Sequence, residues 1–156
     1  MMDLSVIRGV LLDIDGTLLR GEDIIEGARE FLEFLGEEGI PFLIVSNNTN
    51  SPGHYRELFK KHGIVIDEDR IVTATVTLEE YLSGHKEIFS AYVIGKSDLL
   101  RAVERAGVRI LKDASEVDIG EVADTVIVGG DFDLSYRKLK DAVLHLQNGA
   151  RLIGSN

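Results

Sequence analysis

Two aspartates, Asp13 and Asp15, stand two residues apart at the end of an apolar stretch of the sequence. If this stretch is a β-strand, the alternation of side chains along it directs both carboxylates to the same side. Two carboxylates that lie close together repel each other unless a cation or a shared proton relieves the repulsion. Magnesium suits this role because it takes oxygen ligands and needs only one or two carboxylates besides water and phosphate oxygens. The pair therefore indicates a Mg²⁺ site at Asp13 and Asp15.

Neutral polar residues follow this strand and a second apolar stretch, residues 41–45. Gly16 allows a sharp turn of the backbone and can offer its N–H to an anion, because no Cβ stands in the way. Ser46, Asn47 and Asn48 add hydroxyl, amide and backbone donors without any charge. A carboxylate nucleophile, a metal ion that masks charge and neutral donors to the non-bridging oxygens together favour phosphoryl transfer.

Other readings of these motifs need weighing. A calcium-binding loop that started at Asp13 would need Gly at its sixth position and Glu at its twelfth, where this sequence has Leu18 and Ile24, so that reading fails. Asp15 and Gly16 could also form an ordinary polar turn after a strand, since both residue types favour turns. The Ser-Asn-Asn sequence could likewise be a plain loop, and each motif taken alone leaves that alternative open.

Composition narrows the classes of partner. The 156 residues contain 27 Asp and Glu against 17 Lys and Arg, which gives a net charge of −10 and disfavours nucleic acid and anionic membranes as partners. There is no cysteine, so disulfides, thiolate zinc sites and a cysteine nucleophile are excluded. The apolar stretches are too short to span a bilayer, and the first residues lack the features of a signal peptide. We expect a cytoplasmic location.

Strand-like and helix-like segments alternate along the chain, which predicts an α/β fold with parallel sheets. In the first half, strands are expected at residues 6–14, 41–45 and 71–74, and Thr77 with Glu80 suggests a capping box for the helix that contains them. The run of apolar residues at 10–12 is typical of a strand that is covered on both faces.

The second half contains a weak internal repeat of two βαβ units, each with a Gly-ended strand, a helix and a Gly before the next strand. Apolar periodicity fades around residues 83–90. We therefore expect two domains, residues 1–82 and residues 83–156.

The sequence also resembles a known family. Residues 11–18, Leu-Leu-Asp-Ile-Asp-Gly-Thr-Leu, are similar to the first signature of the haloacid dehalogenase superfamily of aspartyl-phosphate phosphatases. Residues 43–49 resemble its second motif. Their doubled Asn is similar to the branch of p-nitrophenyl phosphatases and phosphoglycolate-type or nucleotide and sugar phosphatases. The resemblance implies a Rossmann-like core, of which residues 1–82 would be the N-terminal part, and an inserted α/β cap domain made of the two βαβ units.

By this resemblance Asp13 would be the nucleophile and Asp15 the general acid and base. The Asp13 side chain and the Asp15 backbone carbonyl would bind Mg²⁺. The phosphate would be held by a set of polar residues and backbone N–H groups that comprises Gly16, Thr17, Ser46, Asn47 and Asn48. The cap would exclude water and read the leaving group.

The resemblance also implies a lysine motif and a later acidic motif, both downstream of the cap, and the sequence reaches neither. We therefore expect these residues to be an N-terminal portion that is inactive alone. The edge of the Asp13 strand away from its two expected neighbours would be bare. Two loop acids, Asp131 and Asp133, are expected to be solvated, with contact to substrate as the alternative.

The function that these observations favour is a magnesium-dependent phosphatase that acts through an aspartyl-phosphate intermediate. Its substrate would be a small phosphomonoester of the sugar, nucleotide, phosphoglycolate or p-nitrophenyl phosphate type. The alternatives are a phosphotransferase of the same superfamily and an incomplete fragment that acts only in assembly. A homodimer formed through the cap is a further possibility. The identity of the phosphate ester depends on cap loops, for which no transferable code exists.

Overall fold

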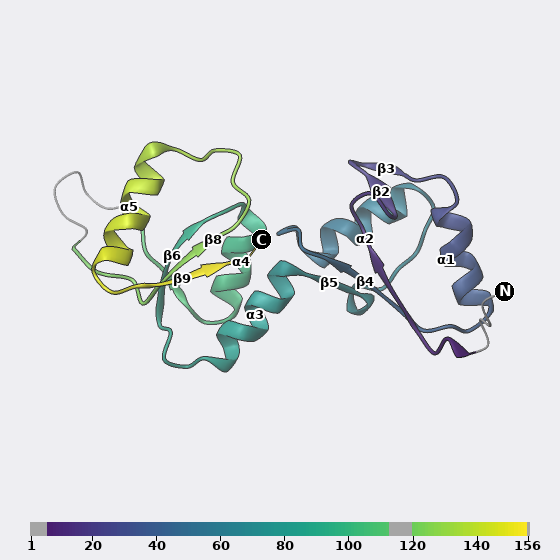
Figure 1. Ribbon diagram of the computed structural model, residues 1–156, viewed down its shortest axis with the longest axis horizontal. Coiled ribbons are helices and arrows are strands. Elements are labelled where there is room, and N and C mark those ends of the chain that lie inside the picture. The colour runs from purple at the N-terminus through teal and green to yellow at the C-terminus, as the bar shows by residue number, and fades with distance from the viewer. Residues whose placement is uncertain (1–5, 113–119, 156) are drawn as a thin grey trace. The chain divides into compact units, whose positions relative to one another are not determined.

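The computed structural model describes residues 6–112 and 120–155, and the chain forms two compact units (Figure 1). The first unit runs to Ser46 and also contains Pro52–Thr73, whereas the second contains Asn47–Ser51 and the residues from Ala74 onward. Among the described residues, no helix is both long enough and apolar enough to cross a membrane.

The first unit is built on a three-stranded parallel sheet in the order β1-β4-β5. A two-stranded antiparallel ribbon, β2 with β3, follows β1 along the chain. The elements of this unit are β1 (Val10–Asp13), β2 (Leu19–Arg20), β3 (Asp23–Ile24), α1 (Ala28–Glu37), β4 (Phe42–Ser46), α2 (Pro52–Lys61), η2 (Glu68–Arg70) and β5 (Ile71–Thr73). The predicted strands are therefore present, although β1 begins four residues later than expected.

One face of this sheet carries the core of the first unit. Leu12 and Ile44 are buried against apolar side chains of α1 and α2, such as Leu32 and Phe59. On the other face of β1, Leu11 is 70% exposed. We predicted that residues 10–12 are covered on both faces. Within the part of the chain that the structure describes this prediction is wrong, because helices cover only one face of β1. Within the described ranges β4 is the single neighbour of β1, as predicted.

The second unit contains a four-stranded parallel sheet in the order β7-β6-β8-β9. Two βαβ units, β6-α4-β7 and β8-α5-β9, form it, which confirms the internal repeat. Its elements are α3 (Ala74–Gly84), β6 (Ser90–Ile94), α4 (Ser97–Arg105), β7 (Arg109–Ile110), β8 (Thr125–Val128), α5 (Tyr136–Gln147) and β9 (Arg151–Gly154).

Helices cover both faces of this second sheet (Figure 1). Ala91 and Ile127 pack with Leu99 of α4 and with apolar residues of α3, while Tyr92 and Val126 pack with α5. Adjacent strand residues thus enter opposite cores, which explains why these strands read as continuous apolar runs.

Helix α3 begins at Ala74, so Thr77 and Glu80 lie inside it and the predicted capping box is wrong. The helix follows β5 directly, and the Ala74 N–H is bound by the Asn48 carbonyl at 3.2 Å. In this structure α3 packs with the second unit. The domain boundary at residues 82 and 83 stays a prediction.

Gly129, directly after β8, occupies a site without room for a side chain. A Cβ there would lie 2.8 Å from Leu99 Cδ2 and 2.7 Å from Ser155 Oγ. Leu99 is fully buried and cannot move aside easily. Gly129→Ala should therefore lower the free energy of unfolding by about 1–3 kcal/mol.

Gly130→Ala is the matched control, because its Cβ would meet only Thr49 Oγ1, at an ordinary 3.8 Å. This variant should change stability by less than about 0.5 kcal/mol. Urea unfolding of the two variants measures the difference, and equal stabilities would contradict the close packing at Gly129.

Candidate active site at the ends of two parallel strands

The register of β1 and β4 brings the ends of both strands to one edge of the sheet. The strands are parallel, with Leu12 opposite Ile44 and Asp13 opposite Val45. Asp13 is the last residue of β1, and Ser46 closes β4 one residue beyond Val45. The carboxyl ends of parallel strands are where ligands bind in open α/β sheets.

Side-chain alternation at the end of β1 is as the sequence predicted. Leu12 and Ile14 are buried, while Asp13 and Asp15 are exposed. The two apolar residues anchor this end of the strand in the core and leave both carboxylates on the solvent side.

A tight turn follows the aspartate pair. The Ile14 carbonyl accepts the N–H groups of Leu18 and Leu19 at 3.0 and 2.9 Å, and Gly16 has a φ of 86°, which favours glycine. The Gly16 N–H donates to the Leu19 carbonyl at 2.7 Å. The amide that we expected to face an anion is therefore engaged in the turn. Thr17, at the tip, is exposed, and its N–H donates to the Ile14 carbonyl at 3.2 Å.

The oxygen donors here fit magnesium by type. Two carboxylates suit an ion that completes its shell with water and phosphate oxygens. Among the described residues no group of three or more His, Asp or Glu side chains could hold a metal ion. Asp13 and Asp15 would therefore supply only part of the ligand shell of such an ion.

The last residue of β4 and the segment that follows it carry the neutral polar side chains. Ser46 is buried, Asn47 is exposed and Asn48 is half-buried. The Asn48 side-chain oxygen accepts the Asn50 N–H at 3.3 Å, so the amide nitrogen is the end of that side chain suited to an anion.

The loop after β8 departs from expectation. The Asp131 side chain is only 6% exposed. Its carboxylate accepts hydrogen bonds from the Lys138 ammonium at 2.7 Å and from the Asp133 N–H at 2.9 Å. The prediction of a solvated Asp131 is wrong, because Lys138 of α5 folds back onto it. The loop presents Phe132, 89% exposed, with the Lys96 ammonium 4.1 Å from the ring centroid.

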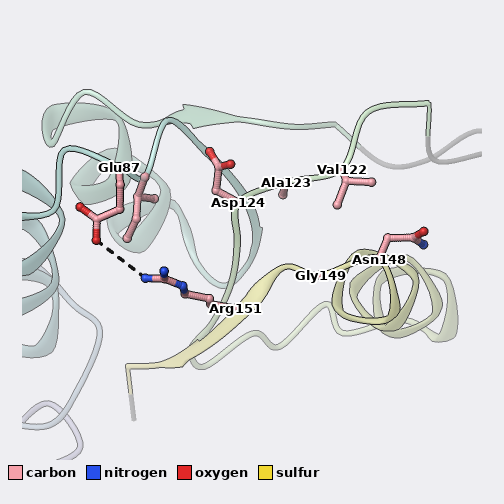
Figure 2. Close-up of a pocket in the computed structure, with 8 residues that line it drawn as sticks. Glu87, Val122, Ala123, Asp124, Asn148, Gly149 and Arg151 are labelled. Carbon is pink, nitrogen blue, oxygen red and sulfur yellow. Dashed lines mark ion pairs between the residues drawn. The ribbon is translucent and has the colours of Figure 1, made fainter.

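A pocket of about 420 Å³ lies at the other end of the second sheet, near the amino ends of β8 and β9 (Figure 2). Arg151 and Glu87 form an ion pair across it at 3.7 Å. Asp124 accepts the N–H groups of Phe89 and Ser90 at 2.9 and 2.8 Å. Its carboxylate thus binds the backbone at the start of β6, which is a structural role.

Sequence reasoning missed one acidic contact near the candidate donors. Asp98 of α4 accepts the Ser51 N–H at 2.7 Å. In the sequence Asp98 reads as an ordinary acid in the first turn of a helix, and no local pattern indicates a partner 47 residues away.

Comparison with known proteins now places the chain. It belongs to the haloacid dehalogenase-like hydrolases, whose family model matches residues 10–109. An acid sugar phosphatase of Staphylococcus saprophyticus is 34% identical over 150 residues, which are 96% of this chain and 55% of that protein. The chain therefore spans about half the length of the curated relatives it matches.

Two solved structures share the fold. A hypothetical protein from Pyrococcus horikoshii OT3 is 39% identical with a TM-score of 0.81, and the match covers 94% of this chain and 57% of that one. A putative p-nitrophenyl phosphatase from Bacillus subtilis is 31% identical with a TM-score of 0.78, and the match covers 99% and 57%. The α/β class, the parallel sheets and the family expected from the motifs are confirmed.

The Asp131–Lys138 contact predicts a specific pH dependence. The hydrogen bond from Lys138 lowers the pKa of the Asp131 carboxyl below its ordinary 3.8, against the raising effect of burial. A carboxyl whose pKa is lower in the folded state contributes stability above its unfolded pKa, and this contribution is lost as the pH falls below that value. Asp131→Asn should reduce stability at pH 7 by about 1–2 kcal/mol and weaken the acid sensitivity below pH 3.8.

Asp133→Asn serves as the control, since the Asp133 side chain is exposed. Unfolding free energies measured from pH 7 down to pH 3 test the difference. If both variants followed the wild-type pH profile, the ion pair would not contribute to stability.

Proposed function

We propose that the protein is a magnesium-dependent phosphatase that hydrolyses a small phosphomonoester through an aspartyl-phosphate intermediate. The observation that carries the proposal is the β1–β4 register, because it places Asp13 beside the last residues of β4. A nucleophilic carboxylate and neutral donors then share one edge of the sheet.

In the proposed reaction, an Asp13 carboxylate oxygen attacks phosphorus, and the bond from phosphorus to the ester oxygen breaks. Asp15 gives its proton to the leaving alcohol. Asp15 then takes a proton from a water molecule, whose oxygen attacks the phosphorus of the acyl phosphate and frees Asp13 and inorganic phosphate.

The remaining residues would bind and orient the phosphate. The Asp13 side chain and the Asp15 backbone carbonyl would hold Mg²⁺, which when bound offsets the negative charge of the phosphate. Ser46, Asn47 and Asn48 would donate to its non-bridging oxygens. Gly16 and Thr17 would shape the turn beside it. Gly16 would act through its left-handed conformation, since its N–H is bound within the turn.

The second unit is proposed to act as the cap that reads the leaving group. Phe132 and Lys96 follow β8 and β6 at the carboxyl ends of that sheet, and the exposed ring could stack on a sugar or an aromatic group. The relatives named acid sugar phosphatase and p-nitrophenyl phosphatase support these two leaving-group classes.

A homodimer through the cap and a cytoplasmic location also remain proposals. An apolar stripe on α5 supports the first, because Tyr136, Leu139 and Val143 lie on one helical face and are 83%, 46% and 48% exposed. The acidic net charge of −10 still argues against nucleic acid and anionic membranes as partners.

In the full-length protein, Asp13→Asn should abolish turnover of p-nitrophenyl phosphate, because an amide cannot form the acyl phosphate and loses the anionic metal ligand. Asp69→Asn, an exposed acid of the same unit, should leave turnover unchanged. Steady-state phosphate release in the presence of Mg²⁺ is the measurement. Activity of Asp13→Asn within about tenfold of wild type would rule out the covalent route.

Asp15→Asn should affect poor leaving groups most. An alkyl phosphate needs a proton on its departing oxygen, whereas p-nitrophenolate departs with little assistance. The ratio of kcat/KM between wild type and variant should therefore be larger for an alkyl phosphate than for p-nitrophenyl phosphate. Equal ratios for the two substrates would remove Asp15 from the acid role.

A further inference from the structure

The loop that carries Asn47 and Asn48 is fixed by long-range contacts within the second unit. The Ala74 N–H donates to the Asn48 carbonyl at 3.2 Å. The Ser51 N–H donates to Asp98 Oδ2 at 2.7 Å. The loop is therefore held near both of its ends, and at one end the acceptor is a carboxylate.

The Asp98 carboxylate is built into its position. Its side chain is only 14% exposed, and its second oxygen accepts the guanidinium of Arg101 one turn further along α4. Burial raises the pKa of Asp98, but the hydrogen bonds from Ser51 and Arg101 outweigh burial and lower it overall. Asp98 is thus a charged acceptor at neutral pH, and such hydrogen bonds are stronger than neutral ones.

Packing restricts the middle of the loop. Thr49 is 2% exposed, and a Cβ at Gly129 would lie 3.0 Å from Thr49 Cγ2. The Asn50 N–H donates to the side-chain oxygen of Asn48. Because Ser51 follows Asn50 directly, the hydrogen bond to Asp98 fixes the adjacent peptide and, through it, the orientation of the Asn48 amide.

We propose that Asp98 is a positioning residue for phosphate binding: it holds the Asn47–Ser51 loop in the conformation in which Asn47 and Asn48 donate to the phosphate. This inference rests on the proposed function. It adds to that function a residue of α4 that does not touch the substrate.

Four variants test the proposal. Asp98→Ala removes the acceptor. Asp98→Ser keeps a side chain suited to the start of a helix, but the serine hydroxyl is too short to reach the Ser51 N–H. Asp98→Asn keeps an oxygen that can accept the same N–H. Glu104→Ala, an exposed acid on the same helix, is the control.

The probe is inorganic phosphate, titrated into the full-length protein in the presence of Mg²⁺, and binding is followed by the backbone amide NMR signals of Asp13, Asn47 and Asn48. Asp98→Ala and Asp98→Ser should each raise the Kd for phosphate about tenfold. Asp98→Asn should recover most of the affinity, and Glu104→Ala should match wild type. Hydrogen exchange of the Ser51 amide should accelerate in the Ala and Ser variants and not in the Asn variant.

The outcomes separate this inference from the proposed function. If wild type binds phosphate and the Ala and Ser variants bind it equally well, Asp98 does not position the loop and the proposed function stands. A lower Tm with an unchanged Kd would likewise overturn the inference, since it marks a purely structural residue. If Asp98→Ala does not fold, Asp98→Ser decides. If phosphate leaves the wild-type signals of all three probe residues unchanged, the proposed function fails and the inference fails with it.

Discussion

The parallel pairing of β1 with β4 is the constraint on which the candidate site depends. The register of the two strands places Asp13 opposite Val45. Both strands therefore end at the same edge of the sheet. A shift by one residue would turn Asp13 and Asp15 toward the core and Leu12 and Ile14 toward solvent. Burial of those two apolar residues therefore fixes the register and, with it, the exposure of the carboxylates.

The two sheets handle burial differently. The sheet of the second unit has helices on both faces, and its close packing extends to Gly129, where no side chain fits. His145 is also buried in this core, with 1% of its surface exposed. Its Nδ1 accepts a hydrogen bond from the Ala123 N–H. Desolvation lowers the pKa of His145, so the ring is neutral at pH 7. The first sheet instead leaves Leu11 and Leu43 partly open to solvent.

Much of the fold could be predicted because its signals are local. Apolar runs ending in Gly or polar clusters indicated the strands, and the two βαβ units repeat a visible pattern. The errors arose where a distant contact decides. Thr77 and Glu80 form a capping pattern, but Asn48, far away in sequence, binds the first helical N–H at Ala74. In the same way Lys138 makes Asp131 a buried ion-pair partner.

In the candidate site, too, local features could be predicted and long-range contacts could not. Asp13, Asp15 and Ser46 follow from strand ends and alternation, which the sequence contains. The commitment of the Gly16 N–H to Leu19 and the contact of Asp98 with Ser51 depend on how the chain returns on itself, and no short pattern encodes them.

Trapping the acyl phosphate on Asp13 would decide whether this aspartate is the nucleophile. The full-length protein would be mixed with p-nitrophenyl phosphate and Mg²⁺, quenched in acid, digested and analysed by mass spectrometry with and without hydroxylamine. A nucleophilic Asp13 should yield a phosphorylated peptide that carries this residue and loses its phosphate in hydroxylamine, as acyl phosphates do. Turnover without such a peptide, or with the phosphate on another residue, would contradict the proposed mechanism.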